Sequence, residues 1–144
     1  MEAPRERISA IRLPEDTNPV KLEACRAYAR MMNNRDHTHI VDWLHDDLQY
    51  SSSWVMETMH GKEVCLTYLK GKMETLKRNN STVWAEIAYT DAFGAGPCVV
   101  VAQGTRENLV ATMLVTMDGD KISRMCMSVL PDPHECRRTG ELPR

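Results

Sequence analysis

The first third of the chain carries apolar residues at helical spacing. Asn18 followed by Pro19 predicts a helix start, because Asn caps helix N-termini and Pro is favoured at the first helical position. Asn33 and Asn34 predict the end of this helix, since Asn tolerates the left-handed conformation that often follows a helix. The apolar stripe between these signals consists of Leu22, Cys25, Ala29 and Met32.

Two further helices are predicted downstream. A short helix starts with Asp36 as its cap and ends at the paired Asp46 and Asp47. A long helix starts at Gly61 and ends at Lys77-Arg78, because cations are favoured at a helix C-terminus. The apolar residues expected to face inward are Ile40, Val41 and Leu44 in the short helix, and Cys65, Leu69, Met73 and Leu76 in the long one. Gly71 indicates either a local cost in helix stability or close packing against a sheet.

Between Asp47 and Gly61 the pattern changes to an alternation of period two, which predicts one central strand. Aromatic, apolar and hydroxyl groups share one face of this strand. Its members are Leu48, Tyr50, Ser52, Trp54 and Met56. We expect this face to form the wall of a pocket.

The second half of the chain reads as strands separated by turns. The four predicted strands cover residues 83–89, 98–103, 109–117 and 121–129. Asp118-Gly119 is a strong signal for a tight hairpin between the last two. Helices grouped ahead of a meandering sheet predict an α+β fold, in which a curved antiparallel sheet wraps around the long helices to form a cone with an open mouth.

The length of 144 residues is that of one domain. We assign residues 18–130 to this domain and residues 1–17 to an N-terminal extension. Residues 131–144 contain three prolines and several basic residues. We expect them to form a C-terminal tail along the surface.

Composition excludes several classes of partner. A net charge of -2 and a pI near 6.2 leave no basic surface for nucleic acid or anionic lipid. No apolar run approaches the ~20 residues of a membrane span, and no signal-peptide pattern opens the chain, so a cytoplasmic protein is expected. The five scattered cysteines indicate reduced thiols that act as small apolar fillers.

Taken together, the element order and one motif region resemble the nuclear-transport-factor-2-like superfamily, which includes ketosteroid isomerases and SnoaL-like polyketide cyclases. The motif region is Trp43-Leu44-His45-Asp46-Asp47, the strand that follows, and Gly61-Lys62-Glu63. The likeness covers roughly residues 19–129. It implies an α+β cone that holds its ligand inside and commonly pairs through the outer face of its sheet.

The isomerase branch of this superfamily implies three catalytic groups, and this chain has a matching residue for one of them. Tyr28 falls where an isomerase keeps its oxyanion-hole tyrosine, Ser52 takes the place of the general-base aspartate, and Met113 falls at or near the place of the protonated aspartic acid. Proton abstraction beside a carbonyl needs a base whose pKa lies near the operating pH, which a serine without a basic neighbour lacks. Losing one oxyanion donor costs about 3–4 kcal/mol. Steroid isomerisation by the usual route is therefore disfavoured.

Two functional hypotheses follow, neither of which requires a cofactor. The first is a protein that binds a small apolar organic ligand, with no assigned chemistry. The second is an isomerase, cyclase or hydrolase that uses Tyr28 as a hydrogen-bond donor with an unidentified acid or base. The candidate ligand-binding residues are Tyr28, Trp43, Leu48, Tyr50, Ser52, Trp54, Met56 and Met113. Alternatively, the tyrosines and tryptophans are core residues whose polar atoms find backbone partners.

Histidines do not predict a metal site. His37, His39 and His45 lie close in sequence, and so do His134 and Cys136, but neither set has the spacing of a zinc site. We therefore expect no bound metal.

A homodimer through the outer sheet face is predicted, because the apolar strands have two faces to bury and the helices cover one. Glu86 alternates with apolar residues, and an unpaired buried carboxylate there would have a raised pKa. The adjacent Trp84 suggests that both side chains lie on the outer face, under a partner subunit. Light scattering that gave a monomer at micromolar concentration would contradict the dimer.

Overall fold

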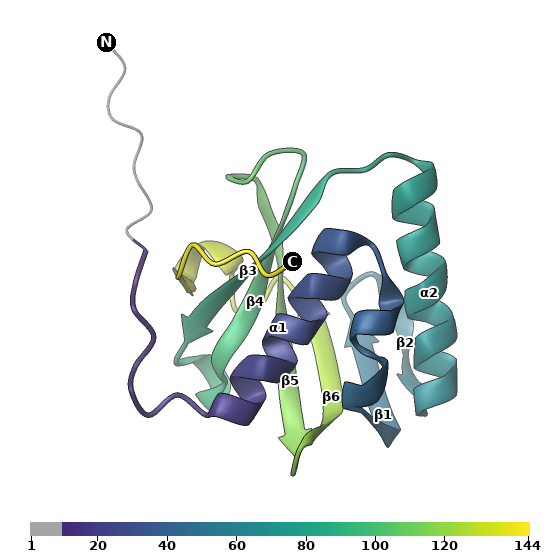
Figure 1. Ribbon diagram of the computed structural model, residues 1–144, viewed down its shortest axis with the longest axis horizontal. Coiled ribbons are helices and arrows are strands. Elements are labelled where there is room, and N and C mark those ends of the chain that lie inside the picture. The colour runs from purple at the N-terminus through teal and green to yellow at the C-terminus, as the bar shows by residue number, and fades with distance from the viewer. Residues whose placement is uncertain (1–9) are drawn as a thin grey trace.

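The computed structural model describes residues 10–144 (Figure 1). Within these residues the chain forms two α-helices and a seven-stranded sheet. The helices are α1 (Pro19–Asn34) and α2 (Lys62–Arg78). The strands are β1 (Leu44–Ser52), β2 (Val55–His60), β3 (Val83–Thr90), β4 (Gly96–Gln103), β5 (Leu109–Asp118), β6 (Lys121–Ser128) and β7 (Arg137–Arg138).

The strand order is β2-β1-β6-β5-β4-β3-β7, and both helices cover the same face of the sheet (Figure 1). Neighbouring strands are antiparallel except β1 and β6, which pair in parallel. The sheet is therefore mixed, where the sequence pattern predicted an entirely antiparallel one. The α+β class, with the sheet packed against the long helices, is confirmed. Among residues 10–144, no helix is long and apolar enough to cross a membrane.

Helix α1 begins and ends as predicted, but the left-handed residue that follows it is Arg35 and not an asparagine. The side chain of Asn18 accepts hydrogen bonds from the N–H groups of Val20 and Lys21, at 3.0 and 3.1 Å. Arg35 has the left-handed conformation, with φ of +54°, so Asn34 is still helical. Asn33 bonds to β3: its amide donates to the carbonyl of Ala85, and its side-chain oxygen accepts from the Ala85 N–H.

The predicted short helix between Asp36 and Asp47 is wrong. Asp36 caps a single 3-10 turn, His37–His39; a second turn, Val41–Trp43, follows, and β1 starts at Leu44. Leu44 and Leu48 are both buried, and a spacing of four residues suits a helix and a strand equally. Pairing of β1 with β6 and β2 decides between the two.

The predicted central strand is a hairpin of two strands. β1 ends at Ser52, Ser53 and Trp54 form the turn, and Val55 starts β2. Ser52 pairs with Val55 and Tyr50 with Met59, so the chain reverses within the stretch expected to be one strand. Consequently the five residues predicted to share one face are divided between two strands and a turn.

Helix α2 confirms three of the four residues of its predicted stripe, whereas Leu76 is only partly buried. Cys65, Leu69 and Met73 are buried against the sheet. A Cβ atom at Gly71 would have no atom within 4 Å outside its own helix neighbourhood, so close packing does not explain this glycine. Gly71 therefore lowers the stability of the helix by about 1 kcal/mol relative to alanine.

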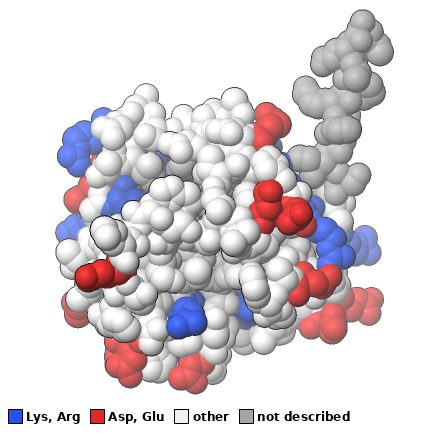
Figure 2. Space-filling view, turned by 180° about the vertical axis from the view of Figure 1, so that it is seen from behind, with Lys and Arg blue, Asp and Glu red and all other residues white. Residues whose placement is uncertain are grey.

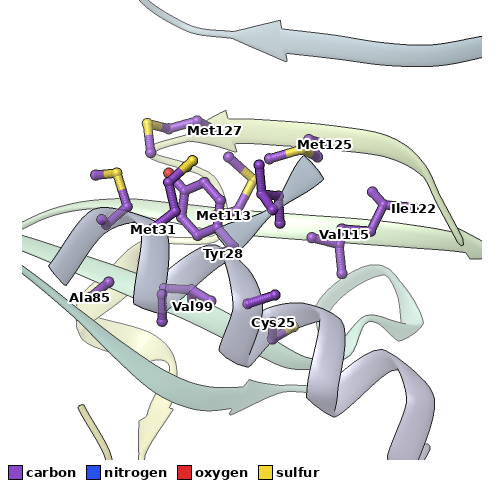
Figure 3. Close-up of a cluster of buried hydrophobic side chains, with 14 of the residues drawn as sticks. Cys25, Tyr28, Met31, Ala85, Val99, Met113, Val115, Ile122, Met125 and Met127 are labelled. Carbon is purple, nitrogen blue, oxygen red and sulfur yellow. The ribbon is translucent and has the colours of Figure 1, made fainter. Parts of the chain in front are cut away.

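The main core lies between the helices and the sheet. Figure 3 shows Tyr28 of α1 among the methionine side chains of Met31, Met113 and Met127. Methionine is flexible and fills irregular space, which suits a core between a curved sheet and two helices.

The C-terminal segment, residues 131–144, does not trail along the surface as expected. The Thr112 hydroxyl on β5 donates to the carbonyl of Pro131 at 2.8 Å. Cys136 packs with Cys98 and Val100 of β4 in a second buried cluster. β7 then pairs with β3 at the sheet edge. The segment therefore covers part of the outer face and adds the last strand.

Glu86 is buried, but it is paired within the chain. Arg138 of β7 donates to Glu86 Oε1 at 2.6 and 3.0 Å, and the Gly140 N–H donates to Oε2 at 2.9 Å. The structure thus contradicts the unpaired carboxylate, and the chain's own C-terminal segment contacts Glu86 where a partner subunit was suggested. Beside this segment, the N–H of Ile11 donates to the carbonyl of Arg138, whereas residues 1–9 of the predicted extension lie outside the described range.

Candidate functional site

A cleft of about 560 Å³ lies between α2, the β1–β2 turn and the sheet. Its walls are largely apolar. They include Met32 of α1, Leu76 of α2, Val83 of β3, Val101 of β4, Val110 of β5 and Met127 of β6. Five strands and both helices contribute to its lining, so it lies inside the curved sheet, where the fold was expected to hold a ligand.

A row of side chains on α2 forms one wall of this cleft. Tyr68, Lys72 and Leu76 are spaced four residues apart, so they lie one above another on the helix. The neighbouring row, Cys65, Leu69 and Met73, faces the core. The helix thus presents one row to the core and the adjacent row to the cleft.

Lys72 is the charged residue of this lining. Its ammonium group lies 3.6 Å from the sulfur of Met127, a weak acceptor, and forms no ion pair with any other described residue. Burial lowers the pKa of the Lys72 amine below its usual value. The sequence analysis missed this residue, although a lysine beside the apolar stripe of α2 was the available signal.

Two of the predicted ligand-binding residues line the cleft. Ser52 is half-buried, and its hydroxyl oxygen accepts a hydrogen bond from the Trp54 N–H at 3.1 Å. Trp54 lies at the mouth with 59% of its surface exposed. Gln103 and Tyr68 also line the cleft, and neither was predicted. The polar groups therefore come from β1, the turn, α2 and β4.

The other predicted residues lie elsewhere. Trp43 lines a more open depression of about 630 Å³ beside the start of α1. Met56 is fully exposed, because the hairpin turn carries it away from the face of Leu48 and Tyr50. Tyr28, Leu48, Tyr50 and Met113 are completely buried in the core. The eight predicted ligand-binding residues therefore do not form one pocket face.

Two buried tyrosines lack hydrogen-bond partners. The hydroxyls of Tyr28 and Tyr50 bond to nothing among the described residues. Burial raises the pKa of both phenols, so both stay protonated. The Tyr50 ring lies 5.3 Å from that of Tyr68, which lines the cleft. The tyrosines thus extend from the core to the cleft wall, and neither a carboxylate nor an imidazole among the described residues bonds to Tyr28.

Replacing Tyr28 with phenylalanine should raise the free energy of unfolding by about 1 kcal/mol, because it removes a buried hydroxyl that lacks a partner. Urea unfolding measures the change. Tyr89→Phe is the control, since Tyr89 is half-buried at β3 and should change stability little. A loss of stability in Tyr28→Phe would contradict the prediction and would show that the hydroxyl is hydrogen-bonded.

Histidines and carboxylates do not gather at the cleft. His45 lies 3.3 Å from Asp118, and His39 lies 3.8 Å from Asp36; both pairs are on the surface. Within residues 10–144, no three side chains of the metal-binding types come together. Asp46 and Asp47 are exposed on β1.

Comparison with known proteins gives structural neighbours but no sequence relatives. No family model matches the chain, and no curated protein matches its sequence. A steroid delta-isomerase from Pseudomonas aeruginosa is similar in structure, with a TM-score of 0.60 and 14% identity over 81% of this chain and 82% of that one. A SnoaL-like protein of unknown function from Burkholderia thailandensis has a TM-score of 0.59 and 12% identity over 77% of this chain and 95% of that one.

A third neighbour is an epoxide hydrolase from M. tuberculosis, with a TM-score of 0.53 and 18% identity over 76% of this chain and 81% of that one. At such low identities these likenesses concern the fold alone. The chain therefore has the nuclear-transport-factor-2-like α+β fold found in SnoaL-like and ketosteroid isomerase-like proteins.

Proposed function

We propose that this protein binds a small, largely apolar organic molecule in the cleft between α2 and the sheet. The observation that carries the proposal is the cleft itself. Its volume of about 560 Å³ lies within the usual range for ligand pockets of about 300–1,000 Å³. Its apolar walls and few polar groups are also typical of such pockets.

Binding is favoured over catalysis by the chemistry of the lining. Isomerisation and hydrolysis need an acid or base placed beside the reacting atoms. The cleft lining holds no carboxylate or imidazole among the described residues, and Ser52 uses its hydroxyl oxygen in the turn. The amine of Lys72 is in the lining, but no carboxylate or imidazole of the described chain lies there to act with it as an acid–base pair. The reactions named for the structural neighbours belong to those proteins, and they are no evidence for an acid or base in this cleft.

In a titration with phenylnaphthylamine, a neutral apolar dye that fluoresces when bound, Trp54→Ala should weaken binding about tenfold. Trp54 covers the mouth of the cleft, and large aromatic side chains at binding sites often contribute more than about 1.4 kcal/mol. Because Trp54 is largely exposed, the variant should keep its stability within about 0.5 kcal/mol.

Met56→Ala is the matched control, because Met56 lies on the same hairpin, is fully exposed and does not line the cleft. Its affinity for the dye should equal that of the unmodified protein. If the dye fails to bind the unmodified protein, or if both variants weaken binding equally, the cleft is not the site.

A homodimer through the outer sheet face stays a prediction. Figure 2, which views the molecule from behind, shows few charged side chains over the middle of this face. An uncharged surface favours a protein partner. The C-terminal segment buries part of the outer face over β3, β4 and β5, so a partner has less surface available than the sequence suggested.

A further inference from the structure

Lys72 places a single positive charge inside an apolar cleft. The residues that line this cleft from α1, β1, β3, β4, β5 and β6 are uncharged, and those from α2 add Tyr68 and Leu76. Close to its ammonium group, the described chain offers the sulfur of Met127 at 3.6 Å. A thioether accepts hydrogen bonds weakly, so most of the hydrogen-bonding capacity of the ammonium group is unused.

Two partly buried arginines of this protein have anionic partners. Arg138 pairs with Glu86, and Arg26 pairs with both Glu23 and Glu141. These pairs offset the cost of removing a charge from water. Lys72 bears this cost without an ion-pair partner among the described residues, and burial accordingly lowers the pKa of its amine. A free cation of this kind is complementary to an anion supplied from outside.

We propose that the cleft selects an organic anion, a molecule with an apolar body and one carboxylate group that pairs with Lys72. The proposal rests on the binding function proposed above and names the ligand class. One cation among apolar walls matches one carboxylate, whereas a polyphosphate would require several cations or a nest of backbone amides. Ser52, Tyr68 and Gln103, which also line the cleft, supply polar groups for the other oxygen of the carboxylate.

Paired ligands of equal chain length test this inference, with decanoate as the anion and decanol as its neutral counterpart. Each is titrated against the dye-loaded protein, and its dissociation constant is obtained from dye displacement. Decanoate should bind the unmodified protein at least about tenfold more tightly than decanol, since the charged contact adds 1.4 kcal/mol or more.

Lys72→Met removes the charge and keeps an unbranched side chain of similar length. It should abolish the preference for decanoate and leave the affinity for decanol unchanged or improved. Lys70→Met is the matched control, because Lys70 lies two residues away on the same helix and is exposed. This control should keep the full preference. Thermal unfolding verifies that both variants are folded.

A second measurement uses the unmodified protein alone. As the pH rises through the pKa of the Lys72 amine, the charge disappears, so the affinity for decanoate should fall while that for decanol stays constant. Tyr68 is the other ionisable side chain in the described lining, and the same loss in Tyr68→Phe would assign it to Lys72.

The outcomes separate the two proposals. Binding of the dye and decanol without preference for decanoate would overturn the anion inference and leave the binding function intact. A preference that survives in Lys72→Met would also overturn it, because the charge would then lie elsewhere. Failure of all three molecules to bind would overturn both.

Discussion

Replacing Arg138 with methionine should lower the free energy of unfolding by about 3–5 kcal/mol, the usual cost of breaking a buried ion pair. The side chains of Arg138 and Glu86 are only 10% and 4% exposed. Without the guanidinium, the Glu86 carboxylate keeps one hydrogen bond, from the Gly140 N–H, and has no countercharge. The carbonyl of Arg106 also loses a donor. Urea unfolding followed by circular dichroism measures the loss.

Arg137→Met is the adjacent control. Arg137 pairs with Asp91, but their side chains are 50% and 85% exposed, and its other contact is the ring of Tyr89. Such surface contacts contribute about 0–1 kcal/mol each. Removing both charges, in Arg138→Met with Glu86→Leu, should recover part of the stability. Equal losses in the two single variants would contradict the account of a buried pair.

Leu48→Ala should lower the free energy of unfolding by about 2–5 kcal/mol, because Leu48 is fully buried and its removal leaves a cavity in the core. The dye affinity of the folded variant should not change, since Leu48 does not line the cleft. This combination distinguishes Leu48 from Trp54, which the sequence pattern placed on the same face. Urea unfolding and the dye titration measure the two quantities.

Asp47→Ala is the control for this variant. Asp47 is the exposed neighbour of Leu48 on β1, and its replacement should change stability by less than about 0.5 kcal/mol. If Leu48→Ala weakened dye binding as strongly as Trp54→Ala, the cleft would extend into the core, contrary to the structure.

Several features of this fold depend on few neighbouring residues and were predicted well. The cap at Asn18 uses N–H groups within three residues. The hairpin predicted from Asp118-Gly119 is present, with its turn at Gly119 and Asp120, and Gly119 has a positive φ that glycine adopts readily. The stripe of Cys65, Leu69 and Met73 is a periodic signal that any sheet-facing helix would carry. The element order that they define was sufficient to suggest the fold.

The candidate site was only partly predictable. The turn at Ser53 and Trp54 contains no glycine, proline or asparagine, so the alternating pattern runs through it unbroken and concealed the hairpin. Ser52 and Trp54 reach the cleft, but Met56 does not. The local sequence does not distinguish Lys72 from an exposed lysine on a helix surface. Only the packing of α2 against the sheet partly removes its side chain from water.

By itself, the sequence determined the two long helices, most of the strands and the class of fold, because these follow from local periodicity and from caps and turns a few residues long. The tertiary structure alone decided which residues meet across long distances. It paired Glu86 with Arg138, folded the C-terminal segment onto the sheet and enclosed Lys72 in an apolar cleft. These contacts join residues far apart in the chain, and local patterns do not encode which partner a side chain meets.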